Sequence, residues 1–226
     1  MKKIGFYLAL SLLINSVYPQ EKSNTASGLS GFDGMKWGTD YKEAKDKFRT
    51  LASSGETKEP VSIIADIPDT EFKVERSKLV YRYLFYKKPE ILLNQKNQNS
   101  PTENNTSGDK PQQGNNSTTS DNDKAIPRLF LVESTFPYVP AEELYNKISA
   151  KYGARNGGNL DDKTNRGYYL WNLDGGYVIQ WIDPYMKKPF SRSIYYLSKE
   201  IVEEIKLDFP KFQYSNELKI LKDILY

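Results

Sequence analysis

The chain of 226 residues contains no cysteine and no histidine. Without these residues it cannot run a serine–histidine–aspartate or cysteine–histidine mechanism, and it lacks the common ligands of zinc. It can form no disulfide, and it cannot carry the lipid that bacterial lipoproteins attach to a cysteine. The chemistry left open is that of carboxylates, oxygen-ligated metals or a serine–lysine pair. No motif for these stands out, so we expect no catalytic residue, no metal site and no cofactor.

Long apolar runs are also scarce, and the one that exists lies at the N-terminus. Lys2 and Lys3 precede an apolar run from Ile4 to Ile14, which is too short to span a bilayer as a helix. This pattern is typical of a secretory signal peptide, which we place at residues 1–20, with cleavage near Gln20 or Ala26. A buried N-terminal helix is the alternative. The sequence thus predicts an exported protein, periplasmic, secreted or on the cell surface, with no membrane span in the mature chain.

A strong charge of one sign is absent too. The formal net charge is +3, from 32 basic and 29 acidic residues. Lys2 and Lys3 are the only charged residues before Glu21, so cleavage near Gln20 leaves 30 basic against 29 acidic residues. A nearly neutral mature chain gives no electrostatic reason to expect nucleic acid or anionic lipid as a partner.

What is present indicates a strand-rich globular protein. The hydrophobic fraction is 38% and the aromatic fraction 13%, and aromatic residues favour strands. Amphipathic helices are predicted after Asp40 and after Pro140, and two more at 200–209 and 216–225. Expected strands cover residues 32–37, 61–67, 78–88, 128–136, 168–173, 177–182 and 191–197. We therefore predict an α+β fold: an antiparallel sheet of six to eight strands with helices on one face, which two βαββ-like halves could form.

One stretch differs in composition from the rest. Residues 94–124 contain no hydrophobic residue, so they cannot bury enough apolar surface to offset the entropy of ordering. We interpret this stretch as a disordered polar loop between a first half at 32–93 and a second half at 125–226. Residues 21–31 are small and polar, and we expect a flexible lead-in there.

The best candidates for a binding surface are aromatic residues on the predicted hairpin around Asp174, Gly175 and Gly176. Because about half of them must point inward, core packing is the alternative for each. Carboxylates near these strands could serve a cell-wall hydrolase, although solvated turns explain them equally well. The aromatic candidates are Tyr169, Trp171, Tyr177, Trp181 and Tyr185, and the carboxylates are Asp161, Asp162, Asp174 and Asp183.

Several short motifs carry a resemblance to known proteins. Phe32, followed by Trp37-Gly38-Thr39 and a charged helix, resembles the start of small exported bacterial α+β envelope proteins. The likeness continues through Ser134-Thr135-Phe136, Glu142-Glu143-Leu144, Lys151-Tyr152-Gly153, Tyr169-x-Trp171 and Ile194-Tyr195-Tyr196. The layout is also similar to the SmpA/OmlA outer-membrane assembly factors and to β-lactamase-inhibitor proteins. The missing lipid-bearing cysteine departs from the SmpA/OmlA pattern.

The resemblance implies a binding module rather than an enzyme. We therefore expect a non-catalytic exported module for an envelope protein or another macromolecule. One alternative is a surface adhesin or host-interaction protein that uses residues 94–124. Another is a carboxylate-based cell-wall hydrolase.

Overall fold

A computed structural model describes residues 28–54, 60–89 and 125–208 of the chain. The expected signal peptide, the polar tract at 94–124 and the expected helix at 216–225 lie outside the described residues.

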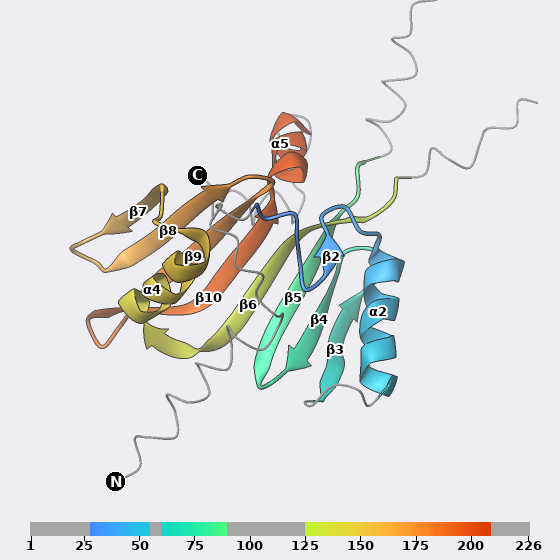
Figure 1. The fold of residues 1–226 in the computed structure, drawn as a ribbon, viewed down its shortest axis with the longest axis horizontal. Coiled ribbons are helices and arrows are strands. Elements are labelled where there is room, and N and C mark those ends of the chain that lie inside the picture. The colour runs from blue at the N-terminus through green and yellow to red at the C-terminus, as the bar shows by residue number, and fades with distance from the viewer. Residues whose placement is uncertain (1–27, 55–59, 90–124, 209–226) are drawn as a thin grey trace, which may run out of the picture.

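The described residues build one eight-stranded antiparallel sheet, to which both halves of the chain contribute (Figure 1). The strand order is β3-β4-β5-β6-β10-β9-β8-β7, so β6 joins the strands of the first half to those of the second. A two-residue turn at Asp174-Gly175, with Gly175 at φ 76°, links β8 to β9 as the sequence predicts. The strands are β3 (Val61–Ile67), β4 (Glu71–Arg76), β5 (Leu79–Tyr86), β6 (Arg128–Pro140), β7 (Gly157–Asp161), β8 (Arg166–Leu173), β9 (Gly176–Tyr185) and β10 (Lys188–Ser198).

Three helices and a small hairpin complete the described part. They are α2 (Tyr41–Ser54), α4 (Ala141–Tyr152), α5 (Lys199–Asp208) and the two-residue strands β1 (Gly31–Phe32) and β2 (Met35–Lys36). The fold is therefore mixed α+β, as expected, with the sheet as its dominant element. Each helix in the described ranges is too short or too polar to cross a membrane.

Helix α2 covers the outer strands of the first half. Its start is capped by Asp40, whose carboxylate accepts a hydrogen bond of 2.8 Å from the backbone N–H of Lys42. The buried side chains of α2 follow helical spacing and pack on Phe72 and Tyr83, which lie on β4 and β5. This contact forms an aromatic core beside the edge strand β3, along which α2 runs in Figure 1.

Helix α4 covers the strands of the second half, in front of which it lies in Figure 1. Its apolar stripe includes Leu144 and Ile148, which pack against Trp171 of β8 and Val178 of β9. We call the side of the sheet that α2 and α4 cover the near face, and the other side the far face.

Helix α5 packs on the far face, which corrects the expectation that all helices share one face. Its buried residues Ile201 and Ile205 belong to a core cluster with Leu84 of β5 and Ile179 of β9. Because side chains alternate along a strand, Ile179 points away from its neighbour Val178, which packs under α4. The three helices are thus divided between the two faces, and α5 stands at one end of the sheet (Figure 1).

The last residues of the expected lead-in are packed rather than flexible. Leu29 is buried, and its N–H donates a hydrogen bond of 2.7 Å to the carbonyl of Asp174 in the β8–β9 turn. The indole N–H of Trp37 donates to the carbonyl of Leu29 at 2.6 Å. Residues 28–31 therefore tie the start of the described chain to the second half of the sheet.

The contact between α5 and the sheet predicts a dependence of stability on pH. Glu204 of α5 accepts hydrogen bonds from Arg128 at 2.6 Å and from Lys88 at 3.2 Å. Burial raises the pKa of Glu204, but these two cations outweigh burial and leave it below its usual value of 4.5. The ion pairs of Glu204 with Arg128 and Lys88 therefore stabilise the folded state above about pH 4.5. This contribution is lost as the pH falls through the pKa of Glu204 in the folded state.

We expect Glu204→Gln to remove that part of the acid sensitivity. In urea titrations, the variant should lose about 1 kcal/mol less unfolding free energy than the parent between about pH 6 and about pH 3. The exposed Glu142→Gln, in the first turn of α4, is the matched control and should follow the parent. Equal pH profiles for the parent and Glu204→Gln would contradict this assignment.

Candidate binding surface

The far face of the sheet carries the best candidate site. Beyond the area that α5 covers, no described helix lies over the strands β10, β9 and β8. The half-buried side chains of Tyr168, Leu170 and Tyr195 pack against the edge of the α5 cluster, and the half-buried Trp181 lies next to Tyr168 outside it. An uncovered sheet face with aromatic side chains can bind another macromolecule without any change in fold.

Tyr168 and Trp181 form the centre of this surface. They are direct cross-strand neighbours on β8 and β9, and their rings lie parallel, with an interplanar angle of 5° and centroids 6.4 Å apart. The register that pairs them follows from the two-residue turn at Asp174-Gly175. The strands thus hold two large, flat rings side by side, and their rigidity keeps the entropic cost of contact with a partner low.

A charged network borders the ring pair towards the first half. Arg82 of β5 donates to Glu71 of β4 through Nε at 2.7 Å, and its Nη1 lies 3.8 Å from Glu133 of β6. Burial raises the pKa of Tyr195, and the adjacent carboxylate of Glu133 raises it further. Tyr195 therefore remains a neutral hydrogen-bonding group at physiological pH, between the rings and the charges.

A second aromatic group lies at the β9–β10 turn, and we call it the tip cluster. It consists of Tyr138, Tyr185, Met186, Phe190 and Arg192. The rings of Tyr138 and Tyr185 are stacked at 4.9 Å and 13°, and the guanidinium of Arg192 lies 5.5 Å from the centre of the Tyr138 ring. Tyr138, Tyr185 and Met186 are 39%, 42% and 78% exposed, so an apolar patch remains open to solvent.

The five aromatic candidates from the sequence divide between three environments. Trp181 and Tyr185 lie on the far face, in the ring pair and the tip cluster. Trp171 is fully buried beneath α4, and Tyr169 packs against the same core. The guanidinium carbon of Arg155 lies 4.1 Å from the centre of the Tyr169 ring. Tyr177 is buried in the cluster that α5 covers. Trp171 and Tyr177 therefore belong to the core.

Three of the four candidate carboxylates have structural roles in turns and ion pairs, and the fourth, Asp162, is exposed between β7 and β8. Asp161 accepts hydrogen bonds from the N–H of Lys163 at 2.8 Å and the hydroxyl of Thr164 at 2.9 Å, which lower its pKa. Asp174 lies in the β8–β9 turn, and Asp183 pairs with Arg166 at 3.5 Å. Within the described ranges, no three acidic side chains come together as metal ligands could.

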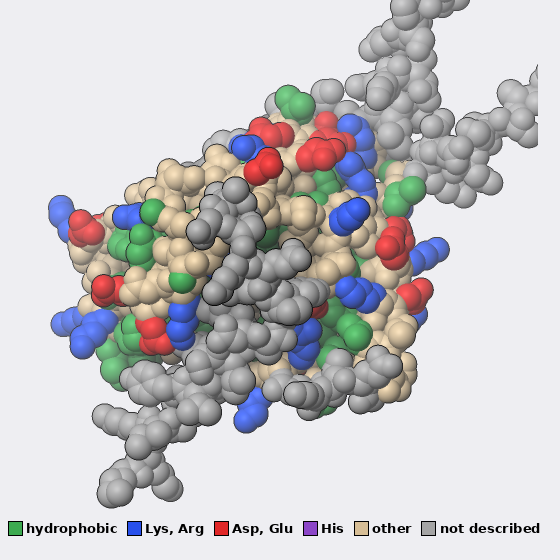
Figure 2. Space-filling view, viewed as in Figure 1, with side chains coloured by type: hydrophobic (Ala, Val, Ile, Leu, Met, Phe, Trp, Pro, Cys, Tyr) green, Lys and Arg blue, Asp and Glu red, His purple; other side chains and the backbone are tan. Residues whose placement is uncertain are grey.

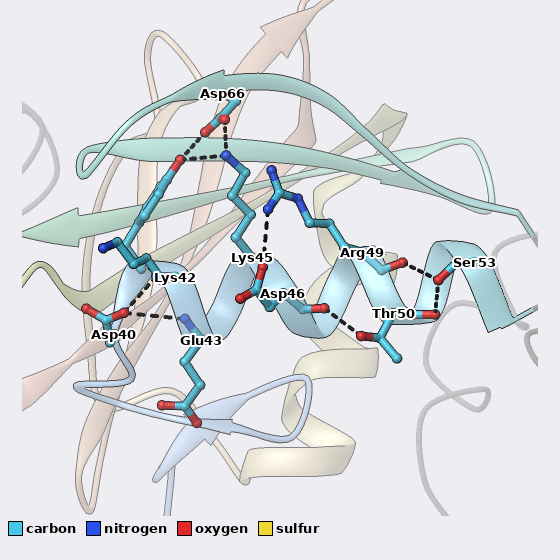
Figure 3. A network of polar contacts seen from close by, with 10 residues as sticks. Asp40, Lys42, Glu43, Lys45, Asp46, Arg49, Thr50, Ser53 and Asp66 are labelled. Atoms are coloured by element: carbon cyan, nitrogen blue, oxygen red, sulfur yellow. Dashed lines mark hydrogen bonds and ion pairs between the residues drawn. The ribbon is translucent and has the colours of Figure 1, made fainter.

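A further polar cluster, which the sequence analysis missed, lies between α2 and β3 (Figure 3). The Tyr41 hydroxyl and the Lys45 ammonium both donate to the carboxylate of Asp66, and these bonds lower the pKa of Asp66. A shallow cleft of about 500 Å³ opens beside them, lined in part by Arg49 and Ser53. Because each charge in this trio has a partner inside the chain, we interpret the cluster as a clamp between helix and strand.

Charges of both signs are mixed on the near face. In Figure 2, basic and acidic side chains alternate over the visible surface without a large area of one sign. Residues that sequence reasoning missed on the far face are Tyr138, Phe190 and Arg192, whose strands β6 and β10 are not neighbours in sequence.

Comparisons with protein-family models, with curated proteins and with solved structures found no match.

Proposed function

We propose that this protein is an exported, non-catalytic binding module whose far sheet face binds another protein of the cell envelope. The observation that carries the proposal is the parallel pair of Tyr168 and Trp181 on a sheet face that no described helix covers there. Aromatic rings held rigidly by strands are the residues that most often dominate binding energy at protein interfaces. A binding module is also what the resemblance of the sequence to exported envelope proteins implies.

The surroundings of the ring pair fit a protein partner. Arg82 already pairs with both Glu71 and Glu133, so a partner gains orientation from this border rather than a strong ionic contact. Leu170 and Tyr195 add apolar and hydroxyl surface next to the rings. An apolar centre with a polar border is the usual anatomy of a protein interface.

Site-specific photo-cross-linking tests the proposal. A photoreactive phenylalanine analogue placed at Tyr168 or at Trp181, in cells that export the protein, should give an adduct of the same mass at both positions. The same analogue at Lys42, an exposed residue of α2 on the near side, is the control and should give none. Absence of an adduct at both far-face positions, or an equal yield at Lys42, would contradict the proposal.

Substitutions then measure what the rings contribute. The cross-linker is placed at Tyr195 for this measurement. In that chain, Tyr168→Ala and Trp181→Ala should each lower the apparent affinity for the captured partner at least about tenfold. Lys42→Ala, at an exposed position of α2 on the near side, should change it less than about twofold. Unchanged binding in both aromatic variants would remove the ring pair from the interface.

A further inference from the structure

The tip cluster is distinct from the ring pair and has a chemistry of its own. Met186 and Lys187 form the two-residue β9–β10 turn, with φ angles of 51° and 62°. A turn with positive φ at both central residues favours asparagine and glycine, whereas a long side chain at such a position carries a conformational cost. Met186 is nevertheless 78% exposed and belongs to none of the three core clusters. Packing in the described fold therefore does not explain a methionine at this apex.

Basic side chains surround the exposed apolar apex. Lys187, Lys188 and Arg192 are exposed, and none of them forms an ion pair with another described residue. The acidic groups nearby are engaged elsewhere or stand apart: Asp183 pairs with Arg166, and Asp161 caps its own turn. Two exposed acidic residues remain: Asp162 in the same β7–β8 turn, and Glu142, two residues beyond Pro140, which pairs with Phe190. The apex is thus locally positive although the whole chain is nearly neutral.

We propose that this hairpin tip binds the surface of an anionic lipid bilayer, with Met186 and Tyr185 entering the interface and the three basic side chains at the headgroups. The kinds of side chain at the tip fit such a surface, since tyrosine favours the headgroup level and lysine and arginine are attracted to anionic lipids. A flexible, unbranched methionine on a projecting turn adapts its shape to its surroundings, which suits a bilayer interface that offers no fixed pocket.

The proposal is independent of the far-face interface, and the two fail separately. The tip cluster lies at the turn end of β9 and β10, while Tyr168 and Trp181 lie further along the strands. A tip variant that no longer binds vesicles should still form the cross-links at Tyr168 and Trp181, which test the protein interface separately. The stacked Tyr138 and Tyr185 rings stiffen the base of the tip, so the apex keeps its position without a partner.

Co-sedimentation of the full chain with lipid vesicles tests the proposal. The protein should bind phosphatidylcholine vesicles that contain phosphatidylglycerol and should bind pure phosphatidylcholine vesicles at least about tenfold more weakly. The triple variant Lys187→Gln, Lys188→Gln and Arg192→Gln should lower partitioning about 100-fold, because each basic residue contributes about one kcal/mol at an anionic surface. Higher salt should weaken binding of the parent chain.

Matched controls separate the tip from a general effect of charge or apolar exposure. Lys36→Gln with Lys42→Gln removes two exposed cations beside α2, and Ile67→Ser removes an isoleucine that is 53% exposed on the edge strand β3. These controls should bind as the parent does, whereas Met186→Ser should bind more weakly by about tenfold or less. Brominated lipids should quench the tryptophan fluorescence of Met186→Trp more than that of Ile67→Trp.

The outcomes decide the proposal in either direction. Weaker binding by the tip variants together with selective quenching at position 186 supports insertion of the tip. The proposal is overturned if the full chain does not bind anionic vesicles. That result is expected if the tip instead recognises an acidic segment of a protein. It is also overturned if the tip variants and the control variants bind alike.

Discussion

Replacement of Trp171 by alanine is expected to lower the free energy of unfolding by about 4 kcal/mol. The side chain has no exposed surface and packs against Leu144 and Ile148 of α4 and against Val178 of β9. Its indole N–H also donates a hydrogen bond of 2.9 Å to the carbonyl of Gly153, the residue that follows α4. The substitution therefore opens a large cavity and removes the bond that holds the end of α4 to the sheet. Urea unfolding followed by circular dichroism measures the effect.

Trp181→Ala is the matched control, because it makes the same change on the adjacent strand and the opposite face. Trp181 is half-buried and contacts Tyr168 without a helix above it in the described fold. We expect a loss of about 1 kcal/mol, in line with partial rather than full burial. A loss of several kcal/mol in Trp181→Ala would place this residue in the core and remove it from the candidate surface.

Gln180→Glu should destabilise the protein by about 3 kcal/mol at neutral pH. Gln180 is fully buried, and its Nε2 donates to the carbonyl of Ala141 at 2.7 Å and to the hydroxyl of Ser191 at 2.9 Å. Its Oε1 has no hydrogen-bond partner among the described residues. A carboxylate at this position brings a negative charge next to a carbonyl oxygen and cannot replace the two donated hydrogen bonds.

The defect in Gln180→Glu should depend on pH with a definite sign. Burial without a cation raises the pKa of such a carboxyl above its value in the unfolded chain. The cost of folding is therefore small while the group is protonated in both states, and it grows as the pH rises above about 4.3. Asn159→Asp on β7 makes the same amide-to-acid change at an exposed position and should alter stability by less than about 0.5 kcal/mol. A similar loss in both variants would contradict the role of Gln180.

Much of the fold follows from local patterns in the sequence. The alternation between Leu79 and Tyr86 and the turn at Asp174-Gly175 predict β5 and the β8–β9 hairpin, and the structure confirms both. Strand β4 went unpredicted because only Phe72 and Val74 are apolar in it, and β7 because glycine and asparagine make up most of it. A polar edge strand has little signal of its own, since pairing with its neighbour stabilises it.

The faces of the sheet could not be assigned from the sequence. The stripe of Ile201, Val202 and Ile205 predicts that α5 has a buried side, but not that this side meets the far face. For the same reason Trp171 and Trp181 look equivalent in sequence, and only the position of α4 separates core from surface. The stack of Tyr138 on Tyr185 depends on β10 lying between β6 and β9, a pairing between distant segments that no local pattern encodes.

Hydroxyl-radical footprinting of the full chain would test most directly whether the far face is an open surface. If the far face is open, Tyr168 and Trp181 are oxidised readily, together with Tyr138 and Tyr185 of the tip cluster, while Trp171 stays protected until the protein unfolds. Protection of Tyr168 and Trp181 to the same degree as Trp171 in the free protein would show that this face is covered, and would contradict the proposed binding surface.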